Sequence, residues 1–189
     1  MSNVGKKIKA QNIWCGFYDS FEEAKSEGKA FGSDQWLSRI TEQLLNYRNE
    51  VQRKDNISVM PPRISELPIL CAQVKPKSII DFGGSSGWAY EYLRDSIQNF
   101  SIESYMILEI PEIVEYMNNS DLHEPPVHYQ TEIGNQTFTD ILYANSVLQY
   151  LDDDSLFLKL IDDSKPPYIL IEDFIGGIFD DYFTIQNYY

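Results

Sequence analysis

Between residues 65 and 173, short apolar runs alternate with amphipathic stretches, and this alternation constrains the fold more than any other feature of the sequence. Five runs have the length and composition of buried strands: 78–82, 105–109, 127–130, 140–144 and 168–172. Helical stretches separate most of them: 88–96, 111–118 and 155–163. Such alternation favours a parallel sheet with right-handed crossovers, so the sequence predicts a doubly wound α/β fold.

The residues before Pro61 lack this alternation and are predicted to form a helical cap. Ser20 and Glu23 have the spacing of a capping box, which favours a short helix to about residue 27. A longer helix is predicted after it, because apolar residues recur every three or four positions: Trp36, Ile40, Leu44, Tyr47 and Val51. We therefore expect a cap or lid over residues 1–60 and a core over residues 61–189.

Charge and cysteine content exclude several classes of function. The 15 lysines and arginines against 29 aspartates and glutamates give a net charge of −14, which argues against nucleic acid or an anionic membrane surface as a partner. Cys15 and Cys71 form no C-x-x-C pair, so neither a disulfide framework nor a zinc site is predicted. The sequence shows no secretion signal and no run of eighteen apolar residues, so we expect a cytoplasmic protein that spans no membrane.

A glycine-rich turn lies between the first predicted strand and a helix, in the segment IIDFGGSSGW at 79–88. Gly83, Gly84 and Gly87 permit close backbone approach, and the amides at the helix start offer donors and a partial positive charge to an anion. Ser85 lies in the middle of this turn. The turn therefore suits a phosphate or a carboxylate, although a plain strand-to-helix turn is the alternative.

Asp81, two residues before the first glycine, narrows the choice of ligand. Its carboxylate would repel a pyrophosphate, and the glycine spacing does not match the G-x-G-x-x-G pattern of dinucleotide-binding loops. An acid beside an anion-binding loop instead suits a zwitterionic amino-acid group, whose carboxylate meets the amides and whose ammonium meets Asp81. S-adenosylmethionine carries such a group, and we expect it as the cofactor.

Further candidates follow strands that end at the same edge of the predicted sheet, where open α/β folds bind ligands. Glu109 can accept hydrogen bonds from ribose hydroxyls; a solvated acid, or the N-terminal charge of the helix that begins at Pro111, is its alternative. Asn145 and Ser146 follow the fourth strand and are candidates for contacts to cofactor or substrate. Glu132 could meet an adenine amino group, although a surface loop acid is the favoured reading there.

The sequence assigns no residue to catalysis or to a metal. His123 lies in a loop and His128 in a strand, and structural or solvent-exposed roles are favoured for both. Glu172 and Asp173 end the fifth strand and are better placed to bind an acceptor, with ordinary solvation as the alternative.

Three segments together resemble class I S-adenosylmethionine-dependent methyltransferases, and more narrowly a methyltransferase family found in bacterial surface-polysaccharide gene sets. IWCGFYDSFEEA resembles the family's Trp-x-Gly-x-Tyr opening, SIIDFGGSSGWAY its Asp-Phe-Gly-Gly cofactor loop, and LYANSVLQYLDD its fourth-strand motif. The resemblance covers nearly the whole chain. It implies a Rossmann-like fold in which Asp81, Gly83, Gly84 and Gly87 surround the methionine part of the cofactor and Glu109 binds its ribose.

The sequence departs from this pattern in three places. Ser85 replaces the usual middle glycine of the loop, and Glu172 with Asp173 stands where the family favours a basic residue. The two strands of the usual C-terminal hairpin are expected to be missing, because the sequence stops at Tyr189. With a strand order of 3-2-1-4-5, the fifth strand is then a sheet edge through which we expect copies of the chain to associate.

These features predict an S-adenosylmethionine-dependent enzyme that methylates a hydroxyl of a sugar or another small molecule. In-line positioning of sulfonium, methyl and acceptor oxygen would matter more than a strong base. Two alternatives stay open. One is a non-catalytic relic or partner subunit that keeps the cofactor loop without the acceptor wall. The other is a different nucleotide-dependent enzyme, which Asp81 disfavours.

Overall fold

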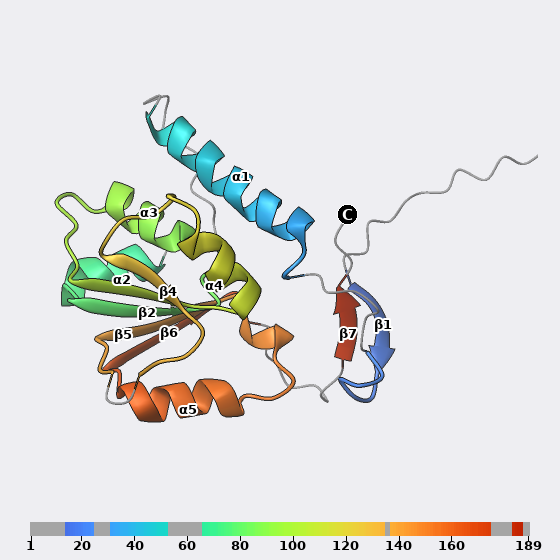
Figure 1. Ribbon diagram of the computed structural model, residues 1–189. Coiled ribbons are helices and arrows are strands. Elements are labelled where there is room, and N and C mark those ends of the chain that lie inside the picture. The colour runs from blue at the N-terminus through green and yellow to red at the C-terminus, as the bar shows by residue number, and fades with distance from the viewer. Residues whose placement is uncertain (1–13, 25–30, 53–65, 135–136, 175–182, 187–189) are drawn as a thin grey trace, which may run out of the picture. The chain divides into compact units, whose positions relative to one another are not determined.

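Five parallel strands form the main sheet of the computed structural model, which describes residues 14–24, 31–52, 66–134, 137–174 and 183–186 (Figure 1). The strands are β2 (Ser78–Phe82), β3 (Ser104–Leu108), β4 (Val127–Gln130), β5 (Ile141–Asn145) and β6 (Tyr168–Glu172). Their order across the sheet is β4-β3-β2-β5-β6, which is 3-2-1-4-5 counted along the chain. The Rossmann-like α/β fold and the strand order are therefore as the sequence predicts.

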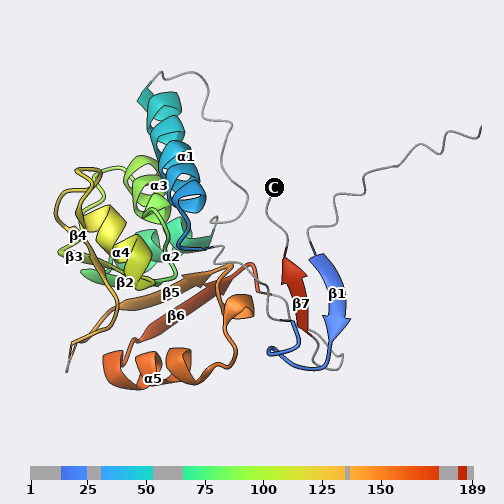
Figure 2. The same ribbon diagram turned by 45° about the vertical axis from the view of Figure 1, so that its right-hand side comes forward.

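Helices cover both faces of this sheet (Figure 2). They are α1 (Asp34–Gln52), α2 (Glu66–Val74), α3 (Trp88–Ser96), α4 (Pro111–Asn118) and α5 (Ser155–Ser164), with a short 3-10 helix at Leu148–Tyr150. Side chains of α1 to α4 share a core with one face of the strands, as Leu67 and Leu93 do, whereas Phe157 and Leu160 of α5 pack on the other face. The sheet is therefore doubly wound.

Helix α1 belongs to the same compact unit as the sheet. The chain divides into residues 31–176 and a smaller unit made of residues 1–30 and 177–189. The predicted boundary near residue 60 lies outside the described residues and stays a prediction, while α1 buries Leu37, Ile40 and Leu44. A lid role for this region stays a prediction.

The smaller unit contains two antiparallel strands that the sequence did not predict, β1 (Trp14–Tyr18) and β7 (Phe183–Gln186). The predicted capping box forms a single turn, in which the Glu23 amide donates to the Ser20 hydroxyl at 3.2 Å and the Glu23 carboxylate accepts from the Asp19 amide. The rest of the predicted helix, residues 25–27, lies outside the described residues.

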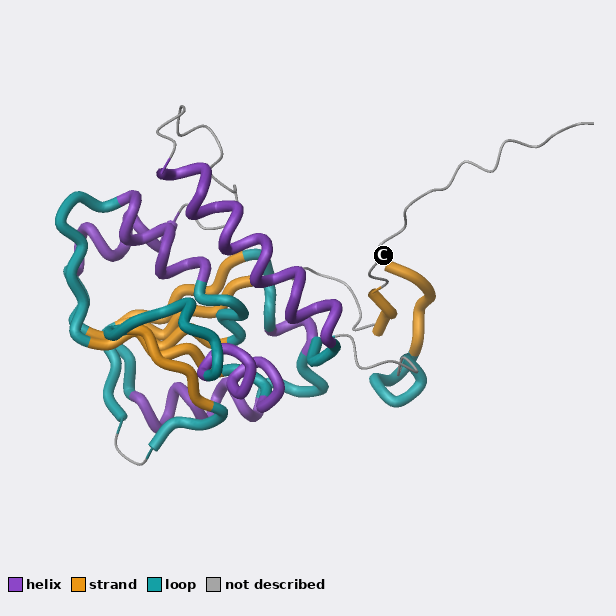
Figure 3. The backbone as a smooth tube through the Cα atoms, turned by 45° about the horizontal axis from the view of Figure 1, so that its top comes forward, coloured by secondary structure: helices purple, strands orange, loops and turns teal. Residues whose placement is uncertain are grey.

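The main sheet lies between helices (Figure 3), and its two edge strands, β4 and β6, differ in how far their side chains are buried. On β4, Val127 and Tyr129 are buried. On β6, the apolar side chains of Tyr168, Ile169 and Ile171 remain more than 40% exposed. Within the described part of the chain, β6 pairs with β5 alone.

None of the described helices is long and apolar enough to cross a membrane.

Candidate functional site

The eight residues predicted to bind cofactor lie at the carboxyl edge of three adjacent strands. Phe82 at the end of β2 is in register with Leu108 of β3 and Ala144 of β5. The loops that follow these three strands therefore start at one level. The chain leaves β2 toward β3 on one side, and β5 lies on the other, so this is the topological switch point where open α/β sheets bind ligands.

The glycine loop requires glycine at two positions for different reasons. Gly83 has φ +71°, and a Cβ there would lie 2.4 Å from a methyl carbon of Val147 in the loop after β5. Gly84 lies against the carboxyl group of Asp81, since a Cβ at Gly84 would lie 2.5 Å from the Asp81 Cγ. The loop thus lies close both to the loop after β5 and to Asp81, the residue before the last of β2.

Asp81 is a buried carboxylate with a single described hydrogen bond. Its side chain is 2% exposed, and its Oδ2 accepts a hydrogen bond from the Tyr105 hydroxyl at 2.7 Å. Burial raises the pKa of Asp81 to about 7, the Tyr105 bond opposes this rise, and the charge of Glu109 adds to it. Among the described residues no lysine or arginine forms an ion pair with Asp81. A cationic group from a ligand would therefore stabilise its ionised form.

Glu109 reaches back from the end of β3 to the glycine loop. Its Oε1 accepts from the Ser85 amide at 2.9 Å and its Oε2 from the Ile110 amide at 3.0 Å. Burial raises the pKa of Glu109, and the two backbone bonds oppose that rise. A carboxylate offers about four lone-pair sites, so Glu109 is held in place with capacity left for two further donors such as ribose hydroxyls.

Asn145 and Ser146 lie on the opposite side of the loop, beside the end of β6. The Asn145 Nδ2 donates to the Tyr143 hydroxyl at 2.8 Å and contacts Glu172 Oε2 at 3.3 Å. Ser146 has φ +53°, and its amide donates to the Glu172 carbonyl oxygen at 3.0 Å. The structure thus places both residues at the sheet edge, with the described bonds of Asn145 directed into a cluster with Tyr143 and Glu172.

Glu172 is a buried acid, not a solvated loop residue. It is 8% exposed, and its carboxylate accepts hydrogen bonds from the Tyr143 hydroxyl at 2.7 Å and from the Glu66 amide at 3.2 Å. Burial raises the pKa of Glu172. Asp173 and Glu132 are exposed, which agrees with the surface reading of Glu132.

Helix α3 begins at the end of the glycine loop without a side-chain cap. Its N-cap is Gly87, with φ +74°. A Cβ on Gly87 would lie 2.8 Å from the Tyr129 hydroxyl and 2.9 Å from His123 Nε2. The amides of the first helical turn are therefore not capped by a protein side chain, which leaves them suited to an anionic group of a ligand.

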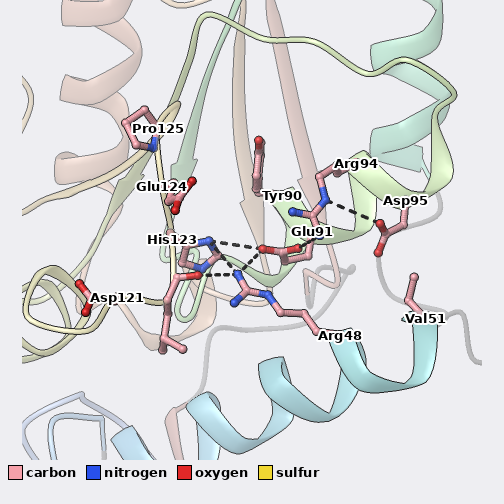
Figure 4. A pocket seen from close by; sticks show the side chains of 11 residues that line it. Arg48, Val51, Tyr90, Glu91, Arg94, Asp95, Asp121, His123, Glu124 and Pro125 are labelled. Carbon is pink, nitrogen blue, oxygen red and sulfur yellow. Dashed lines mark hydrogen bonds and ion pairs between the residues drawn. The ribbon is translucent and has the colours of Figure 1, made fainter. Parts of the chain in front are cut away.

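A third buried acid, Glu91, lies within α3 beside a pocket of about 510 Å³. Figure 4 shows Arg48 of α1, Arg94 of α3 and His123 converging on it. Arg48 Nη2 forms an ion pair with Glu91 Oε1 and donates to the Leu122 carbonyl oxygen at 2.6 Å. The pocket lining carries both cations and acids, and the acid that it buries is already paired.

Sequence reasoning missed Glu91 and the contact of His123 with the loop. Glu91 and Arg94 have the three-residue spacing of an ordinary surface pair on a helix. Arg48 lies 43 residues away from Glu91 in sequence, and His123 lies 37 residues from the Ser86 carbonyl that it contacts. No local pattern links such partners. The described residues contain no group of three or more histidines, cysteines or acids arranged to hold a metal.

No protein-family model and no curated protein matches the chain. Among solved structures, human N-acetylserotonin methyltransferase in complex with SAM is 16% identical over 75% of this chain and 39% of its own, with a TM-score of 0.47. The Bacillus cereus O-methyltransferase in complex with SAH is 14% identical over 71% of this chain and 63% of its own, with a TM-score of 0.43. A plantazolicin methyltransferase in complex with SAH is 13% identical over 74% of this chain and 51% of its own, with a TM-score of 0.41.

The chain thus spans between about two fifths and two thirds of the length of these three methyltransferases. Similarity at this level identifies no function for the chain. We therefore infer its function from its own residues.

Proposed function

We propose that the chain binds S-adenosylmethionine and transfers its methyl group to a hydroxyl of a small acceptor, with a sugar as the favoured class. The observation that carries this proposal is the buried Asp81 carboxylate, which lacks a cation among the described residues and lies against Gly84 of the glycine loop. An amino-acid group supplies the ammonium for Asp81 and a carboxylate for the uncapped start of α3.

The other residues at this edge fit the rest of the cofactor. Glu109, already held by the Ser85 amide, has lone pairs left for the two ribose hydroxyls. Asn145 and Ser146, across the loop, would lie on the side of the transferred methyl group. Bound S-adenosylmethionine supplies an electrophilic methyl on a sulfonium; the chain's residues hold the methionine and ribose parts and orient that methyl toward the acceptor.

Two observations support a sugar as the acceptor. Three segments of the sequence resemble methyltransferases of surface-polysaccharide gene sets, and polar residues lie at this edge of the sheet. The residues that end β5 and β6 at this edge, Asn145, Ser146 and the buried Glu172, are polar rather than apolar. Such groups match the hydroxyls of a saccharide.

Calorimetric titration tests the cofactor. We expect the chain to bind S-adenosylmethionine and S-adenosylhomocysteine and not to bind NAD, because Asp81 repels a pyrophosphate. Transfer of a labelled methyl group to a panel of sugar and nucleotide-sugar acceptors then tests the reaction. Binding of NAD with no response to S-adenosylhomocysteine would overturn the cofactor, and binding without transfer to any hydroxyl acceptor would overturn the activity.

We also propose that two copies of the chain associate through β6. Antiparallel pairing centred on Leu170 would set Ile169 of one copy opposite Ile171 of the other, and it would satisfy the backbone groups of the edge strand. Both side chains are more than 40% exposed in one copy. Light scattering should detect a dimer that the Ile171→Lys variant loses. A monomeric wild-type chain at high concentration would overturn this pairing.

A further inference from the structure

His123 joins three parts of the molecule at the glycine loop. Its Nε2 lies 2.7 Å from the Ser86 carbonyl oxygen, and its Nδ1 lies 3.4 Å from Arg48 Nη2. The side chain of His123 is 5% exposed. The ring therefore lies buried between the loop and helix α1. Figure 4 shows His123 beside Arg48 and Glu91.

These contacts determine which ring nitrogen carries the proton. The Ser86 carbonyl oxygen can only accept a hydrogen bond, so His123 Nε2 must be the donor. Nδ1 faces both Arg48 Nη2 at 3.4 Å and Glu91 Oε1 at 3.5 Å. A lone pair on Nδ1 can accept from the Arg48 guanidinium, which is itself paired with Glu91. Burial lowers the pKa of His123; the Ser86 bond and the charge of Glu91 oppose this, the charge of Arg48 adds to it, and the net direction is down. His123 is therefore a neutral imidazole protonated on Nε2.

The bond from His123 acts on the last peptide group of the loop, directly before α3. The peptide between Ser86 and Gly87 accepts from His123 at its carbonyl oxygen, and its N–H donates to the Gly84 carbonyl oxygen at 2.9 Å. It is thus held on both sides. This peptide connects the Ser85 amide, which bonds Glu109, to the start of α3. Its orientation determines where the loop amides point.

We propose that His123 is a positioning residue for cofactor binding, which holds the Ser86–Gly87 peptide and is itself held by Arg48 of α1. This role rests on the proposed function. The closeness of the ring also explains glycine at position 87, because a Cβ there would lie 2.9 Å from His123 Nε2. Helix α1 thereby takes part in shaping the loop although it contributes no predicted cofactor ligand.

The chain offers a matched control, because it has two histidines, His123 and His128. His128 Nδ1 lies 3.1 Å from the Pro126 carbonyl oxygen, so His128 carries its proton on Nδ1. The structure therefore predicts opposite tautomers for the two rings. Nitrogen chemical shifts of the ligand-free protein at pH 8.5 should show one ring of each kind, assigned with the His128→Gln variant.

Binding measurements then separate positioning from simple packing. His123→Leu removes the donor and should weaken S-adenosylhomocysteine binding about tenfold and speed amide exchange at Gly87 by a similar factor, as expected for one lost hydrogen bond. His123→Gln keeps a donor and should restore most of both. His128→Leu should leave both unchanged. Circular dichroism checks that each variant is folded.

Three results would overturn the proposal: a His123 proton on Nδ1, His123→Leu binding as tightly as wild type, or His123→Gln as weak as His123→Leu. If the wild-type chain does not bind S-adenosylhomocysteine, the proposed function fails instead. In that case the His123 tautomer and the Gly87 exchange rate still decide whether His123 positions the loop.

Discussion

Asp81 and Glu91 are both almost completely buried carboxylates, 2% and 1% exposed, but their charge environments are opposite. Glu91 forms ion pairs with Arg48 and Arg94. Asp81 has the hydroxyl of Tyr105 and, among the described residues, no cation. A buried carboxylate without a cation is unfavourable in its ionised form, which is why burial raises the pKa of Asp81 to about 7.

The two acids differ in whether the described residues supply a counterion. Glu91 joins α3 to α1 with charges that the chain itself supplies, so its role is structural. Asp81 lies at the carboxyl edge of the sheet beside a glycine loop, where open α/β sheets bind ligands, and none of the described lysines and arginines pairs with it. Mutations at the two sites should therefore move stability and ligand binding in different ways.

The largest effect is expected on stability, when the Arg48–Glu91 ion pair is removed. Arg48→Met removes the less exposed of the two arginines, 22% exposed against 51% for Arg94. It leaves Glu91 buried with one half-exposed partner and should lower the free energy of unfolding by about 3 to 5 kcal/mol. Urea unfolding followed by circular dichroism measures this change.

Two further variants control that experiment. Arg94→Met should cost clearly less, about 1 kcal/mol, because its guanidinium is partly solvated. Adding Glu91→Gln to Arg48→Met should recover part of the loss, since the unpaired charge is then removed. Equal losses for Arg48→Met and Arg94→Met would contradict the buried position assigned to the Arg48–Glu91 pair.

Asp81→Asn should weaken ligand binding without lowering stability, in contrast to Arg48→Met. We expect it to weaken S-adenosylhomocysteine binding by about 1 to 3 kcal/mol, because a charge-assisted bond to the ligand ammonium is lost. The folded-state pKa of Asp81 is raised above its usual 3.8, so ionisation lowers stability as pH rises from about 4 to about 7. The variant should therefore be more stable than wild type at pH 8 and no more stable at pH 4. Weaker binding together with lower stability at pH 8 would make Asp81 a structural acid like Glu91.

The sequence predicted the sheet well because the strands are local signals. The runs at 78–82, 127–130 and 168–172 coincide with β2, β4 and β6, and the helix at 88–96 coincides with α3. The strands β1 and β7 were not predicted, because their pairing joins residues about 170 positions apart. Their short segments carry no periodicity that distinguishes them from loops.

The candidate site was predictable only in part, for a similar reason. Asp81 lies near the end of β2 and Glu109 follows β3, and the register of these parallel strands brings both to one edge. That prediction needed only the strand ends. The burial of Asp81, its bond from Tyr105 and the contact of His123 with Ser86 depend on side chains meeting across elements. No spacing in the sequence reveals such contacts.

Binding of S-adenosylhomocysteine should depend on pH through Asp81. Ionised Asp81 is the form that binds an ammonium, so the association constant for S-adenosylhomocysteine should rise by up to about tenfold per pH unit below pH 7 and level off above it. Binding at pH 6 should release a proton, which titrations in buffers of different ionisation enthalpy detect. Asp81→Asn should remove the dependence, and Arg48→Met, if folded, should keep it. Proton uptake on binding would contradict the role of Asp81.

The smallest expected effect concerns Tyr105, whose hydroxyl stabilises ionised Asp81. The Tyr105 hydroxyl donates to Asp81 and lowers its pKa against the effect of burial. Tyr105→Phe removes a bond worth about 1 kcal/mol, so the pKa of Asp81 should rise further and the midpoint of the binding profile should move to higher pH by about 0.5 to 1 unit. Affinity at pH 8.5 should change little, because Asp81 is ionised there in most of both proteins. Tyr143→Phe is the matched control, since its hydroxyl bonds Glu172 instead and its loss should leave the midpoint in place. If the midpoint moves equally in both variants, the shift reflects a general loss of packing around the buried tyrosines. The Tyr105 bond would then not be what lowers the pKa of Asp81.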